Sequence, residues 1–335
     1  VAQCAFAAVL VVLESQCCPE VFAGAGPVFE FDVAVAGLGV GLGLIRTREL
    51  LAARGVDGGR QFFTRAYDFG YTRSLDETLR LWPKEVLLED AVRVIRRFKP
   101  QVVVSIFPGQ PHPNHGQHQA AGVTAHEAFP LAGDPDALPQ LLAEGTEGLL
   151  PWAPQVLYRA GWFNPPPNAI PLSTAAVDPI AGRSLYQIAA ASRSMHRSQD
   201  MGRLQELGPQ QTRVVPVSGS PAEAKDLFAG IDTRLAAIAG SAATVPDPER
   251  RSHAGDHLDS AQVVAERTRA ALNPVRLGES VPGFVEILKH LRAAHAYLDR
   301  PEERSAAELI AEKIDVAEAG LAAAAGIALD ATTES

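Results

Sequence analysis

The chain has 335 residues, of which 47% are hydrophobic and 21% are charged, and its formal net charge at pH 7 is -9. A chain of this length can form one large domain with an appendage, and this composition excludes an intrinsically disordered protein. Because nucleic-acid phosphates are bound by basic surfaces, the negative net charge argues against a nucleic-acid partner. The 3 cysteines, of which Cys17 and Cys18 are adjacent, argue against a disulfide framework.

Signals for membrane insertion or export are weak. No stretch reaches the roughly 18 consecutive apolar residues of a membrane-spanning helix. Residues 5–13 form an apolar run of the kind found in signal peptides, but no basic residue precedes it. We therefore expect no transmembrane segment and a cytoplasmic protein, or an exported one if the true start lies upstream of Val1.

The first half of the chain alternates between helical and strand patterns, as α/β proteins do. The apolar run 102–107 predicts a buried strand of a parallel sheet, followed by a loop at 108–114 and a helix at 117–127. A preceding helix at 85–98 carries apolar residues on one face and arginines on the other, and Pro100 ends it. Further helices are expected at 44–54 and 76–82, and a short strand at 61–64.

The second half continues this alternation and then becomes helical. Expected elements are helices at 137–144, 184–201 and 222–239, and strands at 155–158, 172–178 and 214–217. The polar, proline-containing stretch after them predicts a linker. Helical periodicity then returns at 260–272, 282–298 and 302–329. The apolar stripe of the second of these helices predicts a helical hairpin packed on itself or on the main domain.

These patterns divide the chain into four parts. They are an atypical N-terminal segment (1–43), an α/β domain (44–240), a linker (241–259) and a helical extension (260–335).

The run from His115 to Gly122 is the candidate functional motif. It follows the predicted strand at 102–107, and ligands in open α/β sheets gather at the carboxyl ends of the strands. His115 and His118 are three residues apart, so at the start of a helix they face the same side. Two imidazoles placed in this way suit a metal ligand and an acid–base group. The alternative is a pair of solvated loop histidines.

Five segments of the sequence, in this order, resemble the PIG-L (LmbE-like) family of zinc-dependent de-N-acetylases. The resemblance extends from residue 44 to about residue 230, over more than half of the chain. It implies a Rossmann-like parallel sheet flanked by helices, with Zn²⁺ as the cofactor. It also implies hydrolysis of the N-acetyl group of a small N-acetylglucosamine-type sugar or sugar conjugate. The segments are IRTREL (45–50), RAYDFGY (65–71), DAVRVIRRFKP (90–100), HGQHQAAG (115–122) and SRSMHRSQ (192–199).

The resemblance also assigns roles to individual residues. His118 matches a zinc-binding histidine, and His115 matches the histidine that stabilises the oxyanion or protonates the leaving amine. Arg46 matches an arginine that contacts sugar hydroxyls, Asp68 is the candidate partner of another hydroxyl, and His196 lies in a segment near the pocket. The alternatives are a helix-surface arginine for Arg46 and structural hydrogen-bonding roles for Asp68 and His196.

The N-terminal segment departs from the family pattern. Family members begin with a strand and a His-Pro-Asp-Asp-type motif, whose histidine and second aspartate bind zinc and whose first aspartate is the general base. Here no histidine precedes His112, and residues 1–43 contain all 3 cysteines but no lysine or arginine. Asn114 also stands where the family usually has aspartate. We therefore expect residues 1–43 not to derive from the family's N-terminus and to pack poorly on the domain.

This departure affects the expected activity. Zinc sites use at least three protein ligands, and His118 with a loop residue such as His112 does not supply them all. We expect weak metal binding and slow or absent turnover, unless Glu30 or Asp32 takes the place of the lost carboxylate.

Two other classes of function remain open. A non-catalytic carbohydrate-binding relic of the same fold would keep Arg46, Asp68 and His115 around a pocket. A nucleotide- or sugar-transfer enzyme would use the glycine-rich run 37–43 as a phosphate loop, but its glycines alternate strictly and do not follow the G-x-G-x-x-G spacing. The zinc content of the protein separates the deacetylase from both.

Overall fold

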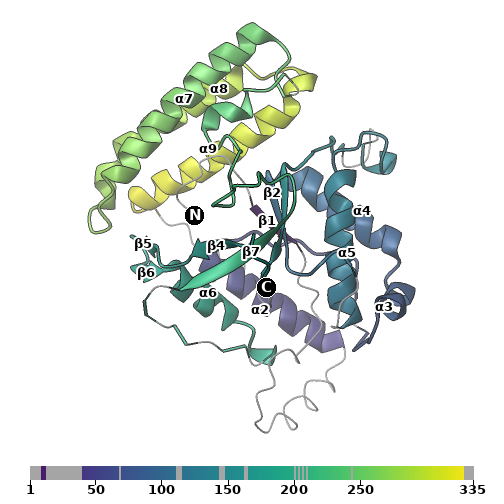
Figure 1. Ribbon diagram of the computed structural model, residues 1–335. Helices are drawn as coiled ribbons and strands as arrows, with labels where there is room; N and C mark the ends of the chain where they lie inside the picture. The colour runs from purple at the N-terminus through teal and green to yellow at the C-terminus, as the bar shows by residue number, and fades with distance from the viewer. Residues whose placement is uncertain are drawn as a thin grey trace, which may run out of the picture. The chain divides into compact units, whose positions relative to one another are not determined.

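The computed structural model describes residues 9–12, 40–67, 69–110, 115–142, 148–161, 165–199, 201–202, 204–205, 207–208, 210–242 and 244–327. The chain forms two compact units (Figure 1). One is Ala8–Gly230, and the other comprises Ile231–Ser335 with Val1–Ala7. Among the described residues, no helix is long and apolar enough to cross a membrane.

The unit Ala8–Gly230 is built around a five-stranded sheet with the strand order β1-β2-β3-β7-β4. Its first three strands are parallel, whereas β7 runs antiparallel to both β3 and β4. The expected α/β class is therefore confirmed, with the correction that the sheet is mixed rather than parallel throughout. The strands are β1 (Val9–Val12), β2 (Val102–Ser105), β3 (Val156–Ala160), β4 (Ile170–Ser173) and β7 (Gln211–Ser218), and a separate small sheet pairs β5 (Val177–Asp178) with β6 (Arg183–Ser184).

The described residues of this unit form five helices, and side-chain caps fix the start of two of them. Ser74 accepts a hydrogen bond from the backbone N–H of Glu77 at the start of α3, and Ser184 forms a reciprocal capping box with Gln187 at the start of α6. The helices are α2 (Val40–Asp57), α3 (Leu75–Leu81), α4 (Lys84–Phe98), α5 (Gly116–Leu131) and α6 (Leu185–Arg193), with short 3-10 turns at Pro139–Leu141 and Arg197–Gln199.

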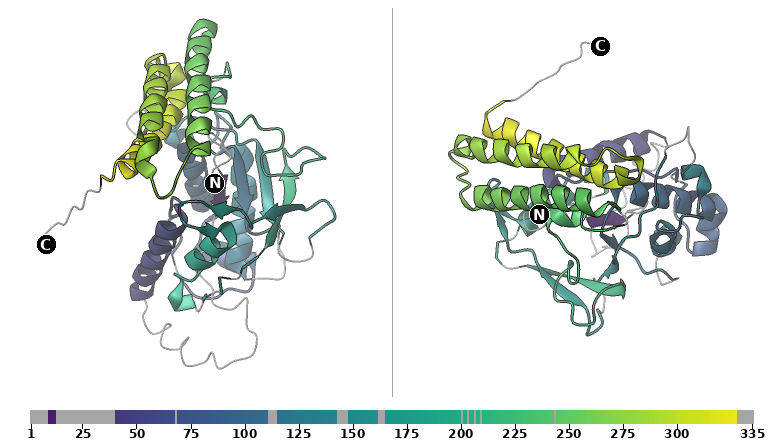
Figure 2. Two further views of the ribbon diagram at one scale, coloured as in Figure 1. Left: turned by 90° about the vertical axis from the view of Figure 1, so that its left-hand side faces the viewer. Right: turned by 90° about the horizontal axis from the view of Figure 1, so that it is seen from above.

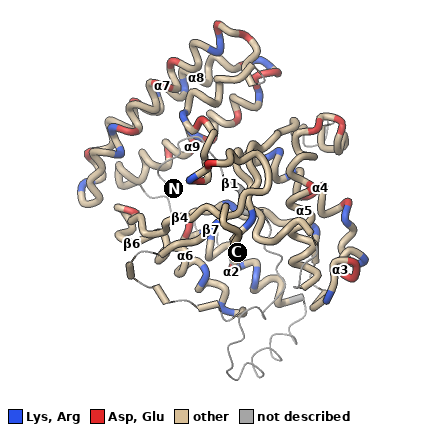
Figure 3. Tube along the Cα trace, in the orientation of Figure 1, with Lys and Arg blue, Asp and Glu red and all other residues tan. Residues whose placement is uncertain are grey.

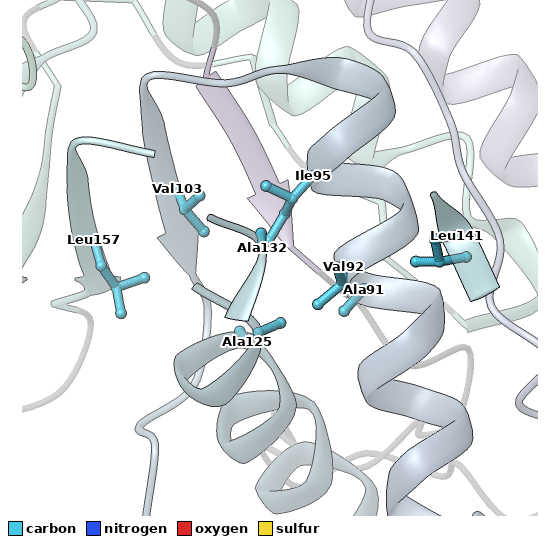
Figure 4. Close-up of a cluster of buried hydrophobic side chains, with 9 residues drawn as sticks. Ala91, Val92, Ile95, Val103, Ala125, Ala132, Leu141 and Leu157 are labelled. Carbon is cyan, nitrogen blue, oxygen red and sulfur yellow. The ribbon is translucent and has the colours of Figure 1, made fainter. Parts of the chain in front are cut away.

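The core of the unit lies where α4 and α5 pack on the sheet (Figure 4). Val92 and Ile95 of α4 meet Val103 of β2 and Leu157 of β3, and all four side chains are buried. The α5 side of the contact is made of alanines, which allow α4 and α5 to approach closely.

Arg96 departs from the expectation that the arginines of α4 lie on the face opposite the apolar residues, because it is buried with them. It is fully buried and donates hydrogen bonds to the backbone carbonyl oxygens of Ala132, Asp134 and Ala137. The last carbonyl groups of a helix and the turn after it lack partners within the helix, so Arg96 satisfies the backbone that follows α5. Burial lowers the pKa of Arg96 and Asp134 counteracts this, yet the guanidinium group stays charged at neutral pH.

The unit Ile231–Ser335 is helical, as expected for the C-terminal region. α8 packs against both α7 and α9, and the views agree that the three helices lie side by side (Figure 2). Leu258 of α7 and Leu288 and Leu291 of α8 are buried there, so neighbouring helices cover the apolar stripe of α8. The helices are α7 (Pro248–Ala270), α8 (Val281–Ala296) and α9 (Arg304–Ala324), with 3-10 turns at Leu235–Ile238, Leu277–Ser280 and Pro301–Glu303.

Several expected elements differ from the structure. The expected strand at 61–64 has no strand pairing, and the expected helix at 222–239 consists of turns that end in the 3-10 turn Leu235–Ile238. The expected linker 241–259 includes the start of α7, because Asp247 caps that helix and Pro248 occupies its first position.

Only a small part of the N-terminal segment is described. Val9–Val12 forms the edge strand β1 and pairs in parallel with β2, and the expectation that residues 1–43 pack poorly stays a prediction. Residues 13–39, which include Glu30, Asp32 and positions 37–39 of the glycine-rich run, lie outside the described residues. Positions 40–43 of that run belong to the first turn of α2 rather than to a loop. The four-part division of the chain stays a prediction.

Candidate functional site

The histidine motif lies at the start of α5, directly after the loop that follows β2. His115 is the N-cap residue of α5 in an extended conformation, and His118 lies in the first turn. His115 is 7% exposed and His118 is 9% exposed, so neither is a solvated loop histidine. The structure brings the two rings together, with 4.6 Å between their centroids.

Aromatic rings on both sides hold this pair of histidines. Phe107, just beyond β2, stacks on His118 with 4.1 Å between ring centroids and 17° between ring planes. Tyr71 meets His115 edge-on at 5.0 Å. Such contacts orient an imidazole and limit the access of water to it. The sequence motif does not reveal either neighbour, because the rings meet only through the tertiary fold.

Both glycines of the motif are required by close backbone approach. A Cβ atom on Gly122 would lie 2.0 Å from the carbonyl oxygen of Pro108, and one on Gly116 would lie 2.1 Å from both the Ser74 carbonyl oxygen and the Thr78 hydroxyl. These distances are far inside van der Waals contact, so α5 can pack here only with glycine at both positions. The start of α5 is thereby fixed against the loop after β2 and against the segment before α3.

Gln117 strengthens this attachment. It is fully buried, accepts a hydrogen bond from the Thr72 hydroxyl at 3.0 Å, and donates one to the carbonyl oxygen of Gly70. The backbone N–H of Gly116 also donates to the carbonyl oxygen of Thr72, at 3.0 Å. The residues between the two histidines therefore hold the backbone that positions them.

His126 is a further buried histidine near the loop after β2. Burial lowers its pKa, the charge of Arg159 lowers it further, and a backbone hydrogen bond with Phe107 only partly offsets these effects. The ring packs against Gly109, where a Cβ atom would lie 2.3 Å from it. A neutral His126 therefore supports the loop that carries Phe107, and the sequence analysis did not identify it.

The other candidate residues gather between α2 and the turn after α6. Arg46 on α2 is 5% exposed, which rules out a helix-surface arginine. Glu49, one turn further along α2, accepts hydrogen bonds from the backbone N–H and the hydroxyl of Ser198, at 2.6 and 2.7 Å. This anchors the turn that contains His196, which is 7% exposed and contacts the Arg193 carbonyl oxygen through Nδ1 at 3.3 Å.

A second link joins α2 to α6. Asp57 accepts hydrogen bonds from Arg54 and from the Ser192 hydroxyl, the latter at 2.7 Å. Burial raises the pKa of Asp57, but the hydrogen bonds from Arg54 and Ser192 outweigh it, so the net pKa lies below its ordinary value. The structure therefore brings His115 and His118 into contact, whereas Arg46 and His196 lie on two segments that are joined through Glu49 and Ser198. Asp68 and His112 lie outside the described residues.

The histidine pair fits zinc in the chemistry of its donors but does not complete a site. Buried imidazoles are common zinc ligands, and zinc requires at least three ligands from the protein. Within the described part of the chain, no group of three or more histidine, cysteine, aspartate or glutamate side chains is arranged to hold a metal ion.

Comparison with known families places these observations in context. The family model described as PIG-L, GlcNAc-PI de-N-acetylase, matches residues 31–128. This match supports the resemblance to the PIG-L family over that part of the chain. No curated protein and no solved structure matches the chain.

The extent of the match bears on the candidate site residues and on the N-terminal segment. It includes Arg46, His115 and His118 and ends before His196. It also begins at residue 31, so the last part of the segment expected to be atypical, residues 31–43, lies inside the family match.

Proposed function

We propose that the chain hydrolyses the N-acetyl group of an N-acetylglucosamine-type sugar or sugar conjugate. The observation that carries this proposal is the buried pair His115 and His118 at the start of α5, just beyond the carboxyl end of β2. This is the edge of an α/β sheet where ligands bind, and both histidines lie inside the family match.

Amide hydrolysis requires an activated water, stabilisation of the oxyanion and a proton for the leaving amine. Zinc, when bound, would polarise the water and the acetyl carbonyl group, with His118 as one ligand. His115 at the N-cap donates the proton to the leaving nitrogen or a hydrogen bond to the oxyanion. The stacking of His118 on Phe107 and the contact of His115 with Tyr71 keep the two rings in place for these different tasks.

Arg46, His196 and Asp68 are proposed to bind the sugar. Burial supports this role for Arg46 and His196, because a buried side chain at a fixed position can direct its hydrogen bonds toward substrate hydroxyls. Nε2 of His196 is buried and has no hydrogen-bond partner among the described residues, which suits it to bind such a hydroxyl. Asp68 keeps the role that the family resemblance assigns to it.

A non-catalytic carbohydrate-binding relic is the second candidate. The observation that favours it is the incomplete ligand set, because no histidine precedes His112 and no group of three ligands is found among the described side chains. A relic would keep the buried pocket residues and lack stoichiometric zinc.

Two measurements on the purified chain test the proposal together. These are the zinc content per chain and the release of acetate from a panel of N-acetylglucosamine conjugates. Stoichiometric zinc with acetate release supports the hydrolase, whereas sugar binding with neither zinc nor acetate release supports the relic. A chain that shows neither zinc, acetate release nor sugar binding would overturn both.

A further inference from the structure

Tyr71 is an aromatic side chain that lies beside the histidine pair and is still open to the solvent. Its ring centroid is 5.0 Å from that of His115, with 65° between the ring planes. His115 is 7% exposed, whereas Tyr71 is 57% exposed. The ring of Tyr71 therefore contacts a buried residue of the candidate site and keeps more than half of its surface available to a ligand.

The backbone on both sides of Tyr71 is attached to the start of α5. The carbonyl oxygen of Gly70 accepts a hydrogen bond from the side-chain amide of Gln117. The carbonyl oxygen of Thr72 accepts one from the backbone N–H of Gly116, at 3.0 Å. Gly70 has a φ of +85°, in the region that favours glycine, so the chain turns directly before Tyr71. The fold therefore fixes the position of Tyr71 beside the histidine pair before any ligand binds.

Two other exposed aromatic side chains on the same segment differ from Tyr71 in their neighbours. Phe63 is 49% exposed and Tyr67 is 56% exposed. Tyr67 meets Phe69 at 5.9 Å, and within the described part of the chain neither Phe63 nor Tyr67 makes a ring contact with the histidine pair. Single exposed aromatic residues are common on protein surfaces. What distinguishes Tyr71 is its contact with His115 and the attachment of its backbone to α5.

We propose that the pyranose ring of the substrate stacks on the ring of Tyr71, an inference that rests on the function proposed above. A pyranose of the gluco configuration carries its hydroxyl groups around its rim and C–H groups on its faces. The face of an aromatic ring is negative and C–H groups are slightly positive, so the two surfaces attract each other and exclude water. A sugar that stacks on Tyr71 lies beside His115, the residue proposed to donate a proton to the leaving nitrogen. The site should therefore select cyclic sugars over open-chain N-acetyl amines with similar hydroxyl groups.

The test compares a cyclic ligand with an open-chain one. The probes are methyl N-acetyl-β-D-glucosaminide and N-acetylglucosaminitol, which has the same acetamide group and no ring. Their dissociation constants for the full chain are measured by ligand-observed NMR. We expect Tyr71→Ala to weaken binding of the glucosaminide by about 3–10-fold, the usual contribution of an aromatic contact, and binding of the open-chain compound by less than about twofold.

A second readout applies to protein that releases acetate. Tyr71 also orients His115, so kcat alone does not separate stacking from an effect on the histidine. The ratio of kcat/KM for the two compounds does separate them, because an effect on His115 lowers both values while loss of stacking lowers only the value for the cyclic sugar.

Matched variants separate the ring of Tyr71 from the rest of the side chain. Tyr71→Phe keeps the ring and should retain the preference for the cyclic sugar. Tyr67→Ala removes an equally exposed tyrosine from the same segment and should leave both dissociation constants unchanged. Circular dichroism checks that each variant is folded.

Three outcomes would overturn the stacking role of Tyr71 and leave the proposed function intact. They are an unchanged affinity of Tyr71→Ala for the glucosaminide, an equal loss of affinity for both compounds, and a Tyr71→Phe chain that binds as weakly as Tyr71→Ala. The last result would assign the contact to the hydroxyl group. An unmodified chain that neither binds nor hydrolyses either compound would instead overturn the proposed function, and the stacking role with it.

Discussion

The two units of the protein hold pairs of histidines in contrasting ways. In the α/β unit, His115 and His118 are nearly fully buried, and glycines that admit no side chain fix their backbone. In the helical unit, His257 and His290 are half-buried and are positioned only by the packing of two helices. The first arrangement suits proton transfer to a bound substrate, because water is limited and the geometry is preorganised. The second leaves a histidine–histidine contact that the solvent can reach.

The helical unit also contains a buried ion pair, between Arg250 and Glu303. Charged residues of both signs are spread along its helices (Figure 3), and ion pairs such as Arg267–Glu286 and Arg292–Glu318 are exposed. Glu303 is the exception, because it is fully buried and accepts hydrogen bonds from Arg250 at 2.8 and 2.9 Å. In this unit the side chain that is both buried and held by hydrogen bonds is therefore Glu303, and not one of the histidines.

Replacement of His115 tests whether the buried histidine pair takes part in catalysis, and its effect on the rate should be the largest of those predicted. In protein that releases acetate, His115→Ala should lower kcat by about 10²–10³-fold, the usual cost of removing a positioned oxyanion donor. Zinc content should not change, because His118 is the assigned ligand. The measurement is acetate release together with metal analysis, with His295→Ala as the control. Parallel loss of zinc and rate would instead place His115 among the metal ligands.

Glu303→Gln tests how much the buried ion pair with Arg250 contributes to the stability of the helical unit. We expect the free energy of unfolding to fall by about 1.5–3 kcal/mol, the usual contribution of hydrogen bonds to a charged group. Urea unfolding of both proteins gives this difference.

The same ion pair predicts a pH dependence. The hydrogen bond from Arg250 holds the pKa of Glu303 below its ordinary value of 4.5, despite the opposing effect of burial. The stabilisation is therefore present above pH 4.5 and is lost as the pH falls through the lower, folded-state pKa. Glu303→Gln should remove this part of the acid dependence, and an unchanged pH profile would contradict it.

Gly122→Ala tests whether close backbone approach fixes the first histidine pair. The new Cβ atom would lie 2.0 Å from the Pro108 carbonyl oxygen, so we expect a loss of about 1–3 kcal/mol in stability. Gly55→Ala is the matched control, because Gly55 lies in α2 with no atom within 4 Å of the added Cβ. It should stabilise the protein by about 0.4–1 kcal/mol. Effects of equal sign in thermal unfolding would contradict this account.

The sequence predicts elements well where local periodicity and packing agree. The predicted ranges for α4, β2 and α5 lie close to those observed. α4 has one apolar face and ends before Pro100, β2 is a continuous apolar run, and α5 is rich in alanine. The expected helix at 222–239 fails for a local reason. Asp226 and Asp232 accept hydrogen bonds from the backbone N–H groups of Phe228 and Arg234, and Gly230 has a φ of +82°, so the chain turns instead.

The candidate site is predictable only in part from the sequence. The spacing of His115 and His118 at the start of a helix predicts that the two rings lie close together, which the structure confirms. The extended conformation of His115 at the N-cap does not follow from that spacing. Phe107 and Tyr71 could not be assigned to the two histidines, because ring contacts depend on how a loop and a separate segment fold back. For the same reason the sequence analysis missed the contact between His257 and His290, which joins two helices. The buried position of Arg96 follows from carbonyl groups beyond the end of α5, which no pattern within α4 indicates.

Phe107→Leu should have the smallest effect. It tests whether the ring of Phe107 helps to hold His118 in position. Leucine keeps much of the apolar volume but removes the ring stacked on His118. An aromatic pair contributes about 0.5–1.5 kcal/mol beyond its buried area, so any zinc bound through His118 should be held about threefold to tenfold more weakly. Phe107→Tyr keeps the ring and should restore the affinity, and Tyr297→Leu in the helical unit should leave zinc at His118 unchanged. If Phe107→Leu and Phe107→Tyr lower the affinity equally, side-chain volume rather than stacking positions His118, and the two units would then differ in burial alone.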